Sequence, residues 1–175
     1  MSNNIIDIII IKGAPGSGKS QVAKSLAKYF PTGVRMEVDA IRQMVISVNW
    51  TNQEEHINML HASTKLVVEF LNQGLCPVIV VDTFSGDKIN RYLETLNKNN
   101  ATLSIKVFGL FTTDEELRNR LNKRSASEFR DFEICKKLND DVLKWKHETE
   151  IQINTTGLTA EQTAEIIYHQ LNSCK

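Results

Sequence analysis

The chain has 175 residues, 41% of them hydrophobic and 24% charged, and its 21 basic side chains balance its 21 acidic ones. This length predicts a single domain over residues 1–175, and the neutral total charge disfavours long-range attraction of nucleic acid. A membrane span is excluded, because no stretch has the roughly 18 consecutive apolar residues that one requires.

The N-terminal sequence MSNNIID has neither the basic start nor the small-residue cleavage site of a signal peptide. We therefore expect a cytoplasmic protein with no membrane partner. The three cysteines, Cys76, Cys135 and Cys174, lie far apart and form no CxxC pair. This spacing favours reduced thiols over a disulfide framework or a zinc site.

The predicted elements alternate between strands and helices. The first, Ile5–Ile11, has the β-branched residues and short length of a strand buried on both faces. The later predicted strands are Val34–Val38, Pro77–Val81, Ile105–Phe111 and Glu150–Ile153. The first predicted helices are Gln21–Phe30, a short one near Ile41–Ile46, and a long one whose apolar face runs from Ile57 to Leu71. A further helix is predicted to start near Gly86. Two more are predicted to begin at the capping pairs Thr113 with Glu116 and Thr159 with Gln162. This alternation predicts an α/β fold of three layers, with a central parallel sheet of about five strands and ligands beyond the carboxyl ends of the strands.

A glycine-rich loop, GAPGSGKS at residues 13–20, joins the first strand to the first helix. It matches G-x-x-x-x-G-K-[ST], the phosphate-binding loop (P-loop), in the strand-to-helix context that the motif requires. Backbone N–H groups freed by the glycines and the helix N-terminus can surround phosphates. We therefore expect ATP with Mg²⁺, Lys19 to reach the β- and γ-phosphates, and Ser20 to bind the metal. The residues expected to bind the nucleotide are Gly13, Ala14, Pro15, Gly16, Ser17, Gly18, Lys19, Ser20 and Gln21.

Two predicted strands end in aspartate, at Asp39 and Asp82. Asp39 and Arg42 lie three residues apart, so they would share one face of a helical turn. Asp39 could accept a proton from the attacking hydroxyl, and Arg42 could hold a phosphate or carboxylate on the acceptor. The alternative is that Asp39 caps a helix and Arg42 is a solvated charge. Asp82 has the form of a Walker B ligand for magnesium, with Thr83 next to the acceptor; the alternative is a helix cap.

The segment LRNRLNKRSASEFR has five basic residues within 118–130 and suggests a mobile lid. Arg120 and Arg124 are four residues apart and so share a helical face, from which they would act on the transferred phosphoryl group. The alternative is a solvated helix in which Glu115 or Glu116 pairs with these arginines. The four histidines share no ligand spacing, which favours packing or surface roles.

The chain resembles the P-loop kinases that include polynucleotide kinase, zeta toxin and chloramphenicol phosphotransferase, through GAPGSGKS, VDAIR, VIVVDT and LRNRLNKR in this order. The resemblance implies a kinase-type P-loop NTPase fold with a lid. It also implies that Asp39 is the base, that Arg42 binds the acceptor, that Arg120 and Arg124 are lid arginines, and that residues 154–157 lie near the adenine. Glu37 and Phe84 depart from the family pattern, which has a small hydroxyl residue and an asparagine at these positions.

Together these features favour an ATP- and magnesium-dependent kinase that phosphorylates a hydroxyl of a small molecule or nucleotide, since two acidic strand ends and a basic lid exceed what hydrolysis needs. A P-loop NTPase or nucleotide-dependent switch is one alternative. A polynucleotide 5′-hydroxyl kinase is another, and the neutral charge disfavours nucleic acid as the partner.

Overall fold

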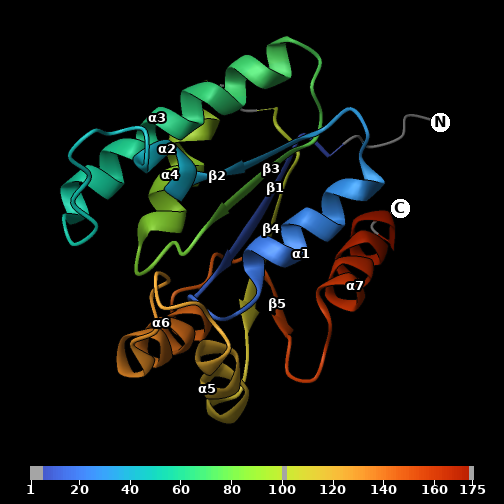
Figure 1. Ribbon diagram of the computed structural model, residues 1–175. Helices are drawn as coiled ribbons and strands as arrows, with labels where there is room; N and C mark the ends of the chain where they lie inside the picture. Colours follow the sequence, from blue (N-terminus) through green and yellow to red (C-terminus); the bar gives the residue numbers. More distant parts are fainter. Residues whose placement is uncertain (1–5, 100–101, 174–175) are drawn as a thin grey trace.

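The computed structural model describes residues 6–99 and 102–173. A sheet of five parallel strands, in the order β2-β3-β1-β4-β5, forms its centre (Figure 1). The strands are β1 (Ile8–Gly13), β2 (Val34–Glu37), β3 (Val78–Asp82), β4 (Ile105–Phe111) and β5 (Ile151–Asn154). The α/β fold with a parallel sheet of five strands, predicted from the sequence, is confirmed.

Helices lie on both faces of this sheet. They are α1 (Lys19–Leu26, followed by a 3-10 turn at Ala27–Tyr29), α2 (Val38–Arg42), α3 (Gln53–Asn72), α4 (Lys88–Asn99), α5 (Asp114–Asn122), α6 (Phe132–Lys144) and α7 (Ala160–Ser173). Helices α3 and α4 cover one face and α1 and α7 the other, while α5 packs against α6 beside β4 (Figure 1). Among the helices within the described ranges, none combines the length and the apolar character needed to cross a membrane.

The four isoleucines of β1 explain why this strand is central. Ile8 and Ile10 pack into the core under α3 and α4, whereas Ile9 and Ile11 pack into the core under α1 and α7. All four are fully buried, as expected for a parallel strand covered on both faces. The strand continues through Lys12 to Gly13, two residues beyond its predicted end, and so carries the glycine loop to the carboxyl edge of the sheet.

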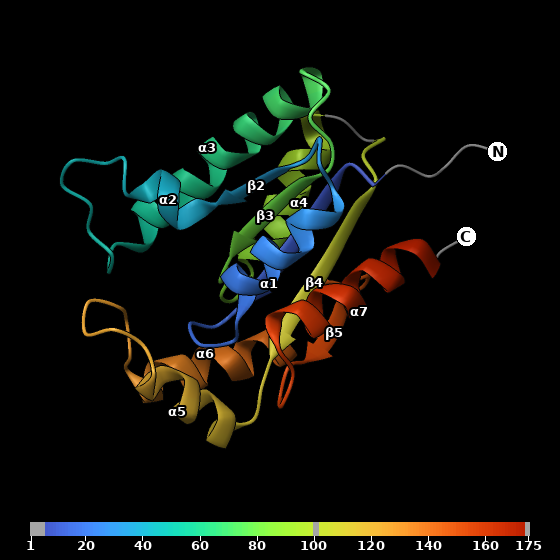
Figure 2. The ribbon, with the colours of Figure 1, turned by 45° about the vertical axis from the view of Figure 1, so that its right-hand side comes forward.

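Two loops extend beyond this edge. The first, residues 43–52, joins α2 to α3, and the second, residues 123–131, joins α5 to α6. Figure 2 shows both loops projecting on the same side of the molecule, to either side of the glycine loop. The helix predicted near Ile41–Ile46 is wrong in its limits: α2 begins at Val38 and ends at Arg42, so Asp39 lies in its first turn and Glu37 holds the N-cap position.

Candidate active site

The glycine loop is a tight turn between β1 and α1, and its residues are buried or half-buried. Gly16 and Gly18 have φ angles of 88° and 91°, in the left-handed region that glycine adopts without a steric penalty. A Cβ atom at Gly16 would lie 2.8 Å from a methyl carbon of Leu117, so the loop also packs closely on α5. No side chain caps α1 at Gly18, which leaves the first N–H groups of the helix for a ligand. The backbone of residues 13–20 therefore fits a phosphate chain.

Lys19 lies in the first turn of α1, among charges from distant parts of the chain. Burial lowers the pKa of its ammonium group, whereas the carboxylates of Asp82 and Asp39 raise that pKa. Arg124, in the second projecting loop, lowers it as well. The fold thus brings together four of the predicted site residues. Gln21 is exposed on α1, and its predicted contact with the nucleotide stays a prediction.

Ser20, predicted to bind magnesium, donates a hydrogen bond to a carboxylate that the sequence did not assign to the site. Its Oγ lies 3.1 Å from Oε2 of Glu37, which also forms an ion pair with Arg35. Glu37 occupies the position where the family pattern has a small hydroxyl residue. That departure was the signal available in the sequence, and the structure places Glu37 beside Ser20.

The oxygen atoms around Ser20 and Lys19 suit a hard cation. The Ser20 hydroxyl contacts the carboxylate of Glu37, and the carboxylate of Asp82 lies close enough to Lys19 to raise the pKa of its ammonium group. Mg²⁺ prefers oxygen ligands of this kind. Within the described parts of the chain, no cluster of three or more histidine, cysteine, aspartate or glutamate side chains could hold a metal by itself. A magnesium ion would therefore take its other ligands from water and nucleotide phosphates, which is how Mg²⁺ usually binds at phosphate sites.

Asp82 is buried at the end of β3, and its carboxylate is held by His56 of α3. His56 Nε2 lies 3.0 and 3.1 Å from the two carboxylate oxygens, and the backbone N–H of Phe84 donates to Oδ2 at 2.9 Å. Lys88 Nζ lies 3.0 Å from His56 Nδ1. Because an ammonium only donates, Nδ1 is the acceptor and Nε2 carries the proton toward Asp82. The carboxylate of Asp82 is therefore held in one orientation.

His56 was missed by the sequence analysis, which treated the histidines as packing or surface residues. The buried face of α3 includes His56, Leu60, Ser63 and Val67, which follow the helical period. The predicted face began one residue later, at Ile57, whose side chain is 41% exposed. Extending the period back by one turn from Leu60 would have identified a buried histidine.

Asp39 is exposed at the carboxyl edge and faces the phosphate loop. Burial by its surroundings raises the pKa of its carboxyl group and Asp82 raises it further, while Lys19 and Arg42 lower it. A carboxylate with a raised pKa accepts a proton more readily, which suits a general base. The alternative that Asp39 caps a helix is wrong, because Glu37 holds that position.

Arg42 is buried, so the alternative of a solvated charge is wrong as well. Nη2 donates to the carbonyl oxygen of Asn49 at 3.2 Å and lies 3.7 Å from Oε1 of Glu55. The guanidinium lies over the ring of Trp50, 4.6 Å from its centre. Nη1 is 4.0 Å from Oδ1 of Asp39. Arg42 thus holds the first projecting loop, and its predicted contact with an acceptor stays a prediction.

Thr83 and Phe84 follow Asp82 at the same edge. Thr83 is half-buried, and its predicted contact with the acceptor stays a prediction. Phe84 is buried with a φ angle of 47° and packs edge-on against Tyr92, with 5.1 Å between ring centres. Helix α4 begins only at Lys88, so Asp82 does not cap it.

The two predicted lid arginines have different surroundings. Arg120 donates from Nη1 to the Ser17 carbonyl at 3.2 Å and to Thr155 Oγ1 at 2.9 Å, and from Nη2 to the Thr155 carbonyl at 2.6 Å. Its Nε pairs with Glu116 at 2.8 Å, as the alternative anticipated. Arg124 lies on the second projecting loop with Glu128 as its ion-pair partner. Arg120 therefore ties the glycine loop to the loop after β5, Arg124 lies on the second projecting loop, and the predicted lid role of both stays a prediction.

We predict that Arg120→Met raises the Kd for ADP and lowers the free energy of unfolding by about 1–3 kcal/mol, because buried carbonyl oxygens of Ser17 and Thr155 lose their donor. Calorimetric titration and chemical denaturation measure the two effects. Lys123→Met, at an exposed position on the following turn, is the charge-matched control. A loss of turnover with an unchanged Kd and stability would instead support the lid role inferred from the sequence.

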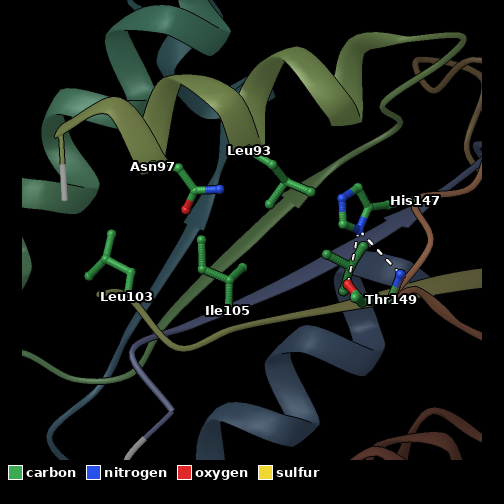
Figure 3. A pocket seen from close by; sticks show the side chains of 7 residues that line it. Leu93, Asn97, Leu103, Ile105, His147 and Thr149 are labelled. Carbon is green, nitrogen blue, oxygen red and sulfur yellow. Dashed lines mark hydrogen bonds between the residues drawn. The ribbon is translucent and has the colours of Figure 1, made fainter. Parts of the chain in front are cut away.

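A hollow of about 190 Å³ lies away from these residues, between α4 and the first half of β4. Figure 3 shows Leu93, Leu103, Ile105 and the His147 ring around it, with His147 Nδ1 hydrogen-bonded to Thr149. No predicted site residue lines this hollow. The candidate active site is therefore the open carboxyl edge of the sheet.

The glycine loop, the parallel sheet and the carboxylates at its carboxyl edge define a P-loop protein of the kinase type. Residues 8–146 match the AAA domain family, and the chain belongs to that family. The resemblance to P-loop kinases is thereby confirmed.

Proteins that are similar to this chain in structure or in sequence include two kinases and a tunicamycin resistance protein. A sugar kinase from Janibacter sp. HTCC2649 superposes with a TM-score of 0.68 and 17% identity, over 97% of this chain and 96% of that chain. The tunicamycin resistance protein of Deinococcus radiodurans superposes with a TM-score of 0.67 and 24% identity, over 95% of each chain. A cytidylate kinase of Fusobacterium nucleatum is 22% identical, over 96% of this chain and 98% of that protein.

Proposed function

We propose that the protein is an ATP- and magnesium-dependent phosphotransferase that moves the γ-phosphoryl group to a hydroxyl of a small-molecule acceptor. One observation carries this proposal. Asp39, an exposed carboxylate in the first turn of α2, lies close enough to Lys19 of the phosphate loop to raise the pKa of the Lys19 ammonium group. A hydroxyl between these two groups would face the terminal phosphate. Similarity to two kinases over almost the full length of the chain, at 22% and 17% sequence identity, supports the same class of reaction.

In this proposal, Asp39, Lys19 and Arg124 each have a separate role in the reaction. Asp39 accepts the proton of the acceptor hydroxyl or orients it, and the oxygen forms a bond to the γ-phosphorus. The bond from that phosphorus to the oxygen bridging to the β-phosphate breaks, and ADP leaves. Lys19 and Arg124 balance the negative charge on the phosphoryl oxygens. Magnesium, when bound near Ser20 and Asp82, neutralises phosphate charge.

The arrangement favours transfer over simple hydrolysis. A hydrolase needs only a residue that positions water, whereas this site presents Asp39 and a buried Arg42 on a separate helix, α2, beyond the phosphate loop. The two projecting loops would enclose an acceptor between them and keep water from the phosphoryl group. These features support a kinase over a nucleotide-dependent switch.

A screen of acceptors with labelled ATP tests the proposal. Sugars, nucleosides, cytidine monophosphate and an oligonucleotide with a 5′-hydroxyl would be compared with a reaction that has no acceptor. We expect label in one small-molecule product at a rate well above release of phosphate in the control. Phosphate release that no acceptor exceeds would identify a hydrolase, and transfer to the oligonucleotide alone would identify a nucleic-acid kinase.

We predict that Asp82→Asn raises the magnesium concentration for half-maximal activity by about 10–100-fold, the usual cost of losing a metal ligand or its supporting group. The amide oxygen still accepts from His56, so the fold around the site is retained. Magnesium titrations of turnover and of ADP binding measure the effect. The control is Asp87→Asn, which removes an exposed carboxylate a few residues away. An unchanged magnesium dependence would remove Asp82 from the metal site.

A further inference from the structure

We propose that the acceptor is a neutral alcohol with an apolar part, and that Glu55 sets this preference by neutralising Arg42. The inference rests on the proposed function and names the class of acceptor for that site. It differs from the expectation drawn from the sequence, in which Arg42 binds a phosphate or carboxylate on the acceptor. The reason lies in the contacts that Arg42 already makes.

Arg42 and Glu55 both hold the backbone of Asn49, in the first projecting loop. Arg42 donates to the carbonyl oxygen of Asn49, while both carboxylate oxygens of Glu55 accept from the N–H of Asn49, at 3.3 and 3.2 Å. The two side chains lie 3.7 Å apart and are 6% and 17% exposed. An anionic acceptor at Nη2 of Arg42 would have to displace a carboxylate that is largely shielded from water and fixed by the loop itself. Such a displacement is costly, because Glu55 would lose its charge partner where it is partly buried.

The other cations beside the acceptor side of the site are engaged too. Lys88 donates to Gln53 Oε1 at 2.7 Å and Ser85 Oγ at 3.2 Å and contacts His56 Nδ1 at 3.0 Å, which uses all three of its N–H groups. Burial also lowers the pKa of its ammonium group. Arg35 pairs with Glu37. Lys88 therefore has no donor left for a phosphate or carboxylate, and Arg35 already has a carboxylate partner.

The sum of charges points the same way. Two carboxylates, those of Asp39 and Glu55, lie 4.0 and 3.7 Å from the single guanidinium of Arg42. A negative group on the acceptor would therefore meet a site with a negative balance, next to the phosphates of the nucleotide. Placing like charges together is a known means of rejecting a wrong ligand. A neutral alcohol avoids this cost and still reaches Asp39.

The first projecting loop also exposes apolar side chains. Met44 is 77% exposed, Ile46 is fully exposed, and Trp50 is 46% exposed while its ring packs on Arg42. Phe129, on the second projecting loop, is 49% exposed. Both loops extend on the side of the glycine loop (Figure 2). Apolar surface beside a few fixed polar groups is typical of small-molecule sites, so these side chains suit the apolar part of the acceptor.

The first test measures anion binding directly. The chain has two tryptophans, and Trp145→Phe leaves Trp50 as the fluorescent reporter on Arg42. With MgADP filling the phosphate loop, sulfate is titrated at constant ionic strength. In this background we expect no saturable change in Trp50 fluorescence over the range of sulfate concentrations used. When Glu55→Gln is added, we expect a saturable change whose Kd for sulfate lies about tenfold or more below the top of that range. Glu54→Gln, an exposed neighbour with the same change of charge, should behave like the background.

Two results would overturn the proposal. Saturable sulfate binding in the background protein, as tight as with Glu55→Gln, would show that Arg42 is free for anions. No gain on Glu55→Gln, in a variant whose thermal unfolding matches the control, would show that Glu55 does not set the preference.

The acceptor screen supplies the second test. Acceptors are compared in pairs that differ by one charge, a nucleoside with its monophosphate and an aryl alcohol carboxamide with its carboxylate. We expect the neutral member of each pair to have the higher kcat/KM, and the ratio to fall in Glu55→Gln. A best acceptor that carries a phosphate or carboxylate would contradict the inference while confirming the kinase. A screen without any transfer would instead contradict the proposed function, and the sulfate titration would still decide the role of Glu55.

Discussion

Asp39→Asn is expected to slow phosphoryl transfer by about 10²–10⁴-fold, the range for loss of a general base. The amide cannot accept the proton of the hydroxyl, although it keeps the size of the side chain. Asp39 lies on α2, outside the glycine loop, so the Kd for the magnesium nucleotide should stay within a few-fold of the wild-type value. Because the pKa of the Asp39 carboxyl is raised, the wild-type rate should also fall as the pH falls through that pKa.

Single-turnover kinetics with saturating acceptor separate this effect from binding. Calorimetry with a non-hydrolysable ATP analogue gives the Kd, and Asp87→Asn is the matched control on the exposed start of α4. Loose transition states need little removal of the proton before transfer. A loss of less than about tenfold would therefore assign Asp39 to orienting the hydroxyl rather than deprotonating it. A large loss of nucleotide affinity would place Asp39 in the magnesium site instead.

Lys12→Met is expected to lower the free energy of unfolding by about 3–5 kcal/mol, the usual cost of removing one partner from a buried ion pair. Lys12 is the last residue of β1 before the glycine loop, and its side chain is fully buried. Nζ lies 2.9 Å from Oε2 of Glu150, whose side chain is also fully buried, and it donates to the carbonyl oxygen of Trp145. Removing the ammonium would leave the Glu150 carboxylate charged and without a cation.

Denaturant unfolding followed by circular dichroism measures this cost. Lys12→Met with Glu150→Gln should recover part of the loss, because the pair is then removed without leaving a charge. Lys136→Met removes a lysine from an exposed ion pair with Asp114, and it should change the stability by about 1 kcal/mol or less. Equal losses for Lys12→Met and Lys136→Met would show that the buried pair contributes nothing special. A measured loss would identify the pair as an anchor between the glycine loop and the segment before β5.

The space around Glu150 explains why this pair was not predicted. A Cβ atom at Gly109 would lie 2.2 Å from Glu150 Oε1, so the carboxylate depends on a glycine in the neighbouring strand β4. The predicted first strand ends at Ile11, before Lys12. Glu150 appears in the predicted elements only as the first residue of the last strand. Neither residue belongs to a local motif, and nothing in their spacing indicates that they meet.

The local patterns predicted the fold well. The isoleucine run gave the central strand, since only a strand covered on both faces needs four successive apolar residues. The pair Thr159 and Gln162 forms both hydrogen bonds of a capping box, at 2.9 and 3.1 Å. The helix predicted at Ile41–Ile46 begins three residues and ends four residues earlier in the structure, because Arg42 is held by tertiary contacts rather than by a local stop signal.

The sequence by itself determined the phosphate loop, the parallel sheet and the acidic end of β3 at Asp82, whereas Asp39 lies in the first turn of α2 and not at the end of β2. Each depends on residues that are neighbours in the chain, so local geometry is enough to define it. Only the tertiary structure decided which partners those residues have: His56 for Asp82, Glu37 for Ser20 and Glu55 for Arg42. These pairs join different elements at the carboxyl edge. Their contacts arise from how the helices pack on the sheet, and no spacing along the chain encodes that packing.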